Sequence, residues 1–388
     1  MRKFDQRSTG PLSDVRVLDL SRLAAGNMLT AYLADFGADV IKVEREGAGD
    51  DLRNWREAGQ DIYWKVYGRN KRSIILDLKS EAGLKDLKRL VATSQVFVEN
   101  FVPGGLEKMG LAPEVLLEAN PKLVIVRISG WGQTGPFSHK PGFGTLVEAM
   151  SGFAFLNGFA DRPPTLPPLA LADMIAGIYG AAGVLTALRA AETGGRGQVV
   201  DLSLFEPIFS MISSEAVKCR LTGVPTMRSG NQSSHTAPRN VYECADGKFV
   251  AMSGSMQSMA FRIFDTIGRS ELKSDPRFAT NDARVMHRDE LDAIISSFIR
   301  MRSQPENLAI FEAAHVTVGP VCSVADLLAH PFVIGREAIV EVEDGELGSI
   351  PMHNIIPRLS RTPGSLRRQA PRLGEHTEEV LGQLGEQH

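Results

Sequence analysis

The first 130 residues alternate short apolar runs with helical stretches, and this pattern constrains the fold more than any other feature of the 388-residue chain. Runs such as "VRVLDL" and "KLVIVRISG" are apolar almost throughout, which is typical of strands that are buried on both faces. We predict strands at 15–20, 38–44, 72–78, 94–101 and 122–130, with helices at 21–36 and 80–92 between them. This alternation indicates an α/β fold with a parallel sheet, whose ligand is expected at the carboxyl ends of the strands.

The second half of the chain predicts a further, smaller domain, because 388 residues are too many for one ordinary core. An apolar helix over 174–191 ends at the glycines of "ETGGRGQ", and a strand that runs into a long helix follows it. The texture changes to small polar residues at 229–238. A hairpin around the turn 245–247 and helices near 257–268 and 288–301 complete the small domain.

Charge and cysteine content narrow the partners and the compartment. A net charge of −3 argues against nucleic acid or an anionic membrane as the main partner. The three cysteines lie far apart without a Cys-x-x-Cys pair, which indicates a reducing cytoplasm. The N-terminus lacks the apolar run of a secretory signal. The apolar run 169–188 contains Asp173 and three glycines, so we interpret it as a buried helix rather than a membrane span.

Several familiar active-site motifs are missing from the sequence. It contains no His-Glu-x-x-His, no Gly-x-Ser-x-Gly and no P-loop, and its eight histidines are scattered, so we expect no metal. Gly26 and Glu44 imitate a dinucleotide site, but Gly26 stands alone where three glycines are needed. An NAD-dependent oxidoreductase is therefore a weak alternative.

Basic residues recur near the predicted strand ends. Any one of them is typical of a solvated surface, but their repeated placement indicates a ligand with several phosphates. They are Arg45, Lys71, Arg72, Lys79, Lys108 and Lys140.

Asp173 is the one carboxylate in the apolar run "PLALADMIAGIYG", and two readings of it compete. As the N-cap of the following helix it would have a structural role, which the local pattern by itself favours. As a poorly hydrated anion it would be a nucleophile toward a carbonyl carbon. The two readings are compatible, because a helix N-terminus favours the ionised form.

Taken together, motifs along nearly the whole chain resemble the class III CoA-transferase family, which includes formyl-CoA and carnitine CoA-transferases. The motifs are "VRVLDLSRLAAG", "GADVIKVER", "NKRSIILDLK", "VFVENFVPGGLEKMG", "ISGWGQTGPFSHKPGF", "LADMIAGIYGAAGVLTAL", "GPVCSV" and "LGEHTEEVLG". The resemblance implies a Rossmann-like large domain built from both chain ends, a smaller α+β domain and an interlocked homodimer. We accordingly expect residues 1–225 in the large domain, 226–329 in the small domain, and 330–388 as a segment that returns to the large domain.

The resemblance also implies the chemistry and its residues. Asp173 matches the catalytic aspartate, which carries CoA from an acyl-CoA thioester to a carboxylic acid through an aspartyl anhydride and an aspartyl–CoA thioester. Coenzyme A is then the one cofactor, as part of the acyl-CoA substrate. The positions that match CoA contacts are Arg45, Leu76, Lys79, Asn100, Phe101, Lys108, Lys140 and Phe143.

Three departures from the family pattern narrow the expected specificity. Ala24 replaces a glutamine of formyl-CoA transferase, and the loop "SGNQSS" is poorer in glycine, so formyl or oxalyl specificity is not expected. Phe143 replaces the histidine of the Gly-His-Asp motif of α-methylacyl-CoA racemases. A racemase-like isomerase and a non-catalytic CoA-binding protein stay open as alternatives. We further expect residues 230–238 to act as a lid and Arg239 to hold the acceptor.

Overall fold

The computed structural model describes residues 1–385, which form two compact units. The first unit comprises Met1–Phe153, Leu166–Leu221 and the chain from Arg336 onward, and the second comprises Ala154–Thr165 and Thr222–Gly335. These bounds differ from the expected domain limits chiefly at 154–165, which we had placed with the N-terminal segment. Hydrogen bonds from Arg228 to the Phe155 carbonyl (3.1 Å) and from the Gly230 N–H to the Gly158 carbonyl (2.9 Å) hold this stretch in the second unit.

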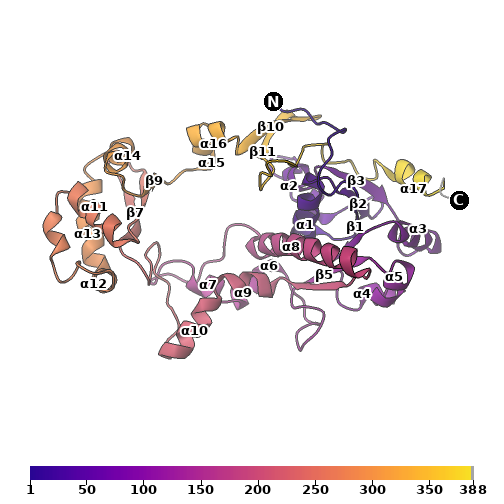
Figure 1. Ribbon diagram of the computed structural model, residues 1–388, viewed down its shortest axis with the longest axis horizontal. Coiled ribbons are helices and arrows are strands. Elements are labelled where there is room, and N and C mark those ends of the chain that lie inside the picture. The colour runs from indigo at the N-terminus through magenta and orange to yellow at the C-terminus, as the bar shows by residue number, and fades with distance from the viewer. Residues whose placement is uncertain (386–388) are drawn as a thin grey trace. The chain divides into compact units, whose positions relative to one another are not determined.

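The first unit is built on a six-stranded parallel sheet in the order β3-β2-β1-β4-β5-β6 (Figure 1). The strands are β1 (Arg16–Asp19), β2 (Asp39–Glu44), β3 (Lys71–Ile75), β4 (Val96–Glu99), β5 (Val124–Ser129) and β6 (Val199–Ser203). Every neighbouring pair is parallel. The mixed α/β class and the strands expected in the first 130 residues are therefore confirmed. The order is that of dinucleotide-binding folds, which bind ligands outside the carboxyl ends of the strands.

Helices cover this sheet on both faces. Those of the first unit are α1 (Leu23–Asp35), α2 (Ile62–Tyr67), α3 (Glu81–Ala92), α4 (Gly105–Lys108), α5 (Pro113–Ala119), α6 (Gly144–Met150), α8 (Leu171–Gly194), α9 (Phe205–Met211), α10 (Ser213–Thr222) and α17 (Thr377–Gly385), with a 3-10 turn at Asp51–Asn54. The short helix α7 (Phe153–Leu156) crosses the boundary between the units. The single long helix that we expected after β6 is wrong, because Ile212 leaves the helical conformation between α9 and α10.

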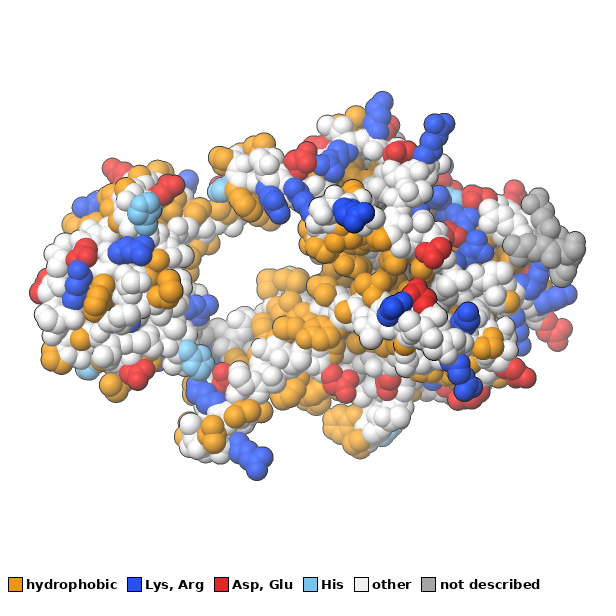
Figure 2. All heavy atoms as spheres, viewed as in Figure 1, with side chains coloured by type: hydrophobic (Ala, Val, Ile, Leu, Met, Phe, Trp, Pro, Cys, Tyr) orange, Lys and Arg blue, Asp and Glu red, His pale blue; other side chains and the backbone are white. Residues whose placement is uncertain are grey.

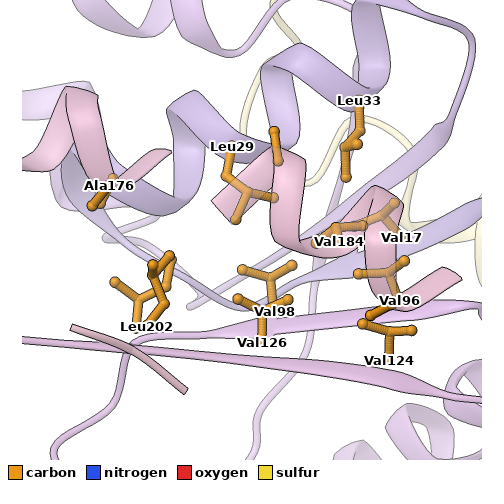
Figure 3. Close-up of a cluster of buried hydrophobic side chains, with 14 of the residues drawn as sticks. Val17, Leu29, Leu33, Val96, Val98, Val124, Val126, Ala176, Val184 and Leu202 are labelled. Atoms are coloured by element: carbon orange, nitrogen blue, oxygen red, sulfur yellow. The ribbon is translucent and has the colours of Figure 1, made fainter. Parts of the chain in front are cut away.

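Successive strand residues point to opposite faces, so the sheet separates two apolar cores. On one face, valines of β1, β4 and β5 pack against Leu29 and Leu33 of α1 and Ala176 and Val184 of α8 (Figure 3). On the other face, Leu18, Ile41 and their neighbours pack against α3, α5 and α17.

Helix α8 is seated against α1 through glycine. A β-carbon added to Gly177 would lie 2.7 Å from the Met28 Cβ, and one added to Gly180 would lie 2.4 Å from the Leu29 Cδ1. This confirms that small residues let another element approach the helix closely. Within the described residues α8 is also the one helix long and apolar enough to cross a membrane, a property that the central helix of a packed core shares. Its buried residues pack into the core below β1 and β5.

The C-terminal part of the first unit adds an antiparallel pair, β10 (Ile339–Asp344) and β11 (Gly348–His353). The second unit has the antiparallel sheet β7-β8-β9, with β7 (Arg239–Glu243) and β8 (Phe249–Ser253) forming the predicted hairpin and β9 (Val318–Pro320) beside them. Its core is closed by helices. The remaining helices are α11 (Gln257–Thr266), α12 (Asn281–Met286), α13 (Arg288–Ile299), α14 (Gln304–Ala313), α15 (Val324–Leu328) and α16 (Pro331–Arg336), with a 3-10 turn at Ser270–Lys273.

Candidate active site

Asp173 lies in the first turn of α8 and is not its N-cap. The helix begins at Leu171, and Ala170 precedes it without a capping side chain, so the capping interpretation is wrong. The local pattern placed the acid at the helix end correctly but missed the start by a turn. Because the cap is excluded, the structure gives this carboxylate no such role at the helix start.

The Asp173 side chain borders a cavity of about 310 Å³ that is mostly apolar. We call it the Asp173 cavity. It is lined by Leu23, Trp55, Phe143, Gly144, Thr145, Glu148, Leu166, Pro167, Leu169, Ala170 and Asp173. Phe143, which the sequence analysis assigned to CoA binding, lies here.

The surroundings of Asp173 make its carboxyl group a weaker acid than usual. Burial, followed by the nearby charge of Glu148, raises the pKa of Asp173 to about 6. Hydrogen bonding to the backbone at Asp173 itself and at Ala25 acts in the opposite direction. At neutral pH the group is therefore largely ionised yet more basic than an exposed aspartate, which suits a nucleophile.

Glu148 was missed by the sequence analysis. It lies on α6 with 3% of its surface exposed, and its Oε1 accepts a hydrogen bond from the Ala172 N–H at 3.1 Å. Gly144 lies four residues earlier on the same face of α6, against the carboxylate of Asp173. An acid within the apolar stretch "GTLVEAM" was the available signal, of the same kind as the one that identified Asp173.

A second and larger pocket, of about 610 Å³, opens at the carboxyl ends of β1, β2, β3 and β4. We call it the strand-end pocket. It is lined by Leu20, Ser21, Arg22, Lys42, Val43, Glu44, Arg45, Glu46, Gly49, Asp50, Leu76, Asp77, Leu78, Lys79, Phe101 and Met109. Four of the residues predicted to contact CoA meet here, namely Arg45, Leu76, Lys79 and Phe101.

These four residues offer two kinds of surface. Leu76 is buried and Phe101 is half-buried, so they give an apolar wall. Lys79 is exposed at the rim, and the exposed Arg45 guanidinium lies 3.4 Å from Asp51. A pocket with apolar walls and cations at its rim suits a ligand that carries phosphates on an apolar body.

The other predicted CoA residues lie elsewhere. Asn100 bonds through its side chain to the backbone of Arg22. Lys108 is exposed on α4 beside Met109, and the Lys140 ammonium lies 3.5 Å from the centre of the Phe137 ring. Neither lysine lines the strand-end pocket.

Lys71 and Arg72, which we expected at the ligand edge, are a correction. They begin β3, so they lie at its amino end, and both are buried. Arg72 pairs with Asp39 at 2.6 Å and with Glu379 at 2.9 Å. The sequence showed cations beside a strand but not at which end of it they lay.

A buried ionic cluster below the strand-end pocket was also missed. The Lys42 ammonium lies 2.7 Å from Asp50 and 3.2 Å from Asp19, and Lys71 lies 3.3 Å from Asp19. Burial opposes the charge on Asp50, but Lys42 and several hydrogen bonds dominate and hold its pKa at about 2. Burial lowers the pKa of Lys71 to about 8. A lysine inside the apolar run "DVIKVE" was the signal.

Comparison with known proteins agrees with this geometry. The family model described as CoA-transferase family III matches residues 12–377. Succinyl-CoA–D-citramalate CoA-transferase of Chloroflexus aurantiacus is 40% identical over 98% of this chain and 95% of its own. Succinate–glutarate CoA-transferase of Agrobacterium fabrum is 36% identical, over 96% of each chain.

Two further relatives extend the comparison. Human succinyl-CoA:glutarate CoA-transferase is 32% identical, over 98% of this chain and 87% of its own. The crystal structure of a CAIB/BAIF family protein from Brucella suis superposes with a TM-score of 0.86 at 32% identity, covering 97% of this chain and 100% of that one. The chain therefore belongs to CoA-transferase family III and is a CoA-transferase.

Proposed function

We propose that this enzyme moves CoA from an acyl-CoA thioester to a carboxylic acid, with Asp173 as the nucleophile that is acylated during turnover. The supporting observation is the half-buried carboxylate of Asp173, whose pKa is raised to about 6, at the edge of a cavity of about 310 Å³. A cavity with mostly apolar walls limits the access of water that would hydrolyse an anhydride.

The reaction balances without ATP or an oxidant. The Asp173 carboxylate attacks the thioester carbonyl, the carbon–sulfur bond breaks, and an anhydride and CoA thiolate form. The thiolate then attacks the aspartyl carbonyl and releases the donor acid, leaving an aspartyl–CoA thioester. The acceptor carboxylate opens this thioester to a second anhydride, and the thiolate attacks the acceptor's carbonyl to give the new acyl-CoA and free Asp173.

We place CoA in the strand-end pocket. Arg45 and Lys79 would bind phosphates there, and Leu76 and Phe101 would contact the adenine or the pantetheine arm. Lys108 and Lys140 remain predicted phosphate contacts from outside this pocket, and Phe143 would meet the acyl end in the Asp173 cavity. No step in this scheme requires a metal.

The names of the relatives bear on the substrates. Three of them are named for transfer between succinate and citramalate or glutarate. We therefore propose succinyl-CoA as donor and a dicarboxylic acid of similar size as acceptor. Residues 230–238 as a lid and Arg239 as a grip on the acceptor remain predictions, as does the cytoplasmic location.

A homodimer is also part of the proposal. Apolar side chains gather over α6 and the first turns of α8 (Figure 2), where Leu146, Met150, Ile178 and Tyr179 are all exposed. An apolar patch of this kind is typical of a surface that is covered in an assembly.

The decisive experiment is to trap the acylated enzyme. After incubation with succinyl-CoA, mass spectrometry of the intact protein and of its peptides should locate an adduct on Asp173. Asp173→Asn and Asp173→Ala should lose transfer and the adduct but still bind CoA. Full transfer activity in either variant would refute the proposal, and deuterium uptake at the α-carbon of a 2-methylacyl-CoA would favour a racemase.

A further inference from the structure

One short turn forms the wall between the two cavities. Arg22 lines the strand-end pocket, and its neighbour Leu23 lines the Asp173 cavity. Leu23 opens α1 with a φ of 63°, a left-handed conformation that residues other than glycine rarely adopt. Such a conformation persists only where its surroundings hold it in place.

Side chains from three separate segments hold this turn by its backbone. The Asn100 carboxamide accepts from the Arg22 N–H at 2.9 Å and donates to the Arg22 carbonyl at 2.8 Å. The Leu23 N–H donates to Asp50 at 2.9 Å, and the Leu23 carbonyl accepts from Asn27 at 2.7 Å. All four backbone polar groups of Arg22 and Leu23 are thus bonded to side chains.

The buried ionic cluster fixes these side chains in turn. Asp50 is paired with Lys42 at 2.7 Å and accepts from Asn27 at 2.7 Å. The Lys71 ammonium donates to the Asn27 Oδ1 at 2.8 Å. The cluster therefore has a consequence beyond local stability, because it fixes the direction in which α1 leaves the turn.

That direction matters to the reaction because α1 begins beside Asp173, where hydrogen bonding to the Ala25 backbone lowers the pKa of the carboxyl. We propose that Asn100, supported by Asp50 and Asn27, is a positioning residue that holds the Arg22–Leu23 turn so that the first N–H groups of α1 face the reacting carbonyl at Asp173. This inference rests on the proposed function. It gives Asn100 a role through the turn rather than as a direct CoA contact.

The test compares how fast Asp173 is acylated with how tightly CoA binds. Asn100→Ala removes both bonds to Arg22, and Asn100→Asp keeps only the acceptor. The matched control is Asn120→Ala, which removes two bonds of the same kind, to the Val91 and Ser94 carbonyls, away from both cavities. Single-turnover acylation by saturating succinyl-CoA is followed by mass spectrometry, CoA affinity by calorimetry, and folding by circular dichroism.

We expect acylation to slow by about tenfold or more in Asn100→Ala, since small errors of alignment are costly to reaction rates. CoA affinity should change by less than about threefold, a difference below 1 kcal/mol. Asn100→Asp should fall between this variant and the wild type, and Asn120→Ala should match the wild type.

Two results would overturn the inference. A loss of CoA affinity that equals the loss of acylation rate would make Asn100 a direct contact to CoA, and an unchanged acylation rate would show that the turn needs no such support. If the wild-type enzyme itself forms no adduct, the proposed function fails instead, which separates the two conclusions.

Discussion

A β-carbon added to Gly144 would lie 2.1 Å from the Oδ2 of Asp173, so the carboxylate rests directly against the start of α6. Only glycine leaves room for it there. The contact joins two segments of the chain that are 29 residues apart and explains why the stretch before α6 approaches α8 so closely.

Gly144→Ala should therefore lower kcat by about 10- to 100-fold, because the methyl group must displace the nucleophile from its position. CoA affinity should be unaffected, since Gly144 does not line the strand-end pocket. Gly183→Ala on α8 is the control, because its β-carbon would lie 3.5 Å from the nearest atom, an ordinary contact with Val200. Steady-state kinetics check both; equal rates for Gly144→Ala and wild type would contradict the assigned geometry.

The pH dependence of kcat/KM should report Asp173. Burial and Glu148 raise the pKa of Asp173 to about 6, so activity should fall as the pH drops through that value and the nucleophile becomes protonated. Glu148→Gln removes the neighbouring charge and should move the acid limb to lower pH. Glu192→Gln, at the exposed far end of α8, should leave it in place. A limb that is identical in all three proteins would count against the coupling of Glu148 with Asp173.

The same shift predicts how stability depends on pH. The folded-state pKa of about 6 lies above the model value of 3.8, so the folded protein binds more protons between these values and loses stability as the pH rises through this window. Asp173→Asn removes this unfavourable charge and should raise the Tm at pH 7 to 8. The advantage should shrink toward pH 4. Differential scanning calorimetry measures both, and a variant less stable than wild type at pH 8 would speak against the burial argument.

The two cations at the rim of the strand-end pocket should act on phosphate. Arg45→Ala and Lys79→Ala should each weaken CoA binding by about tenfold, the usual worth of one charge-assisted hydrogen bond. Dephospho-CoA identifies the contact, because a side chain that binds the 3′-phosphate should make no difference to this ligand. Lys122→Ala provides the control, since Lys122 precedes β5 at the opposite edge of the sheet. Calorimetry that shows no loss in either rim variant would move CoA to another site.

Much of the fold could be predicted from local patterns. Strands such as 16–19 and 124–129 are short apolar runs between turn residues, and Ser80 caps α3 by accepting from the Gly83 N–H, as its Ser-x-x-Gly start indicates. The glycines of α8 signalled its close contact with α1 because their effect needs only the absence of a side chain. These features depend on neighbouring residues alone, so the sequence contains them in full.

The candidate site was predictable in part. Asp173 stood out as an acid in an apolar run, and Arg45, Leu76, Lys79 and Phe101 were named through the family resemblance before the pocket that joins them was known. Glu148, Asp50 and Lys42 were not named, because each acquires its role from a partner distant in the chain. Asn100 was named, but its bonds to Arg22 depend on a turn whose left-handed residue is not a glycine.

By itself the sequence determined the α/β class, the order of strands and helices along the chain, and the one acid placed to react, since all three follow from hydrophobic periodicity and from a charge out of place in it. Only the tertiary structure decided which side chains surround that acid. Solvation, ion pairing and contact distances depend on residues that folding brings together from β2, the start of α1 and α6, and no spacing along the chain encodes those distances.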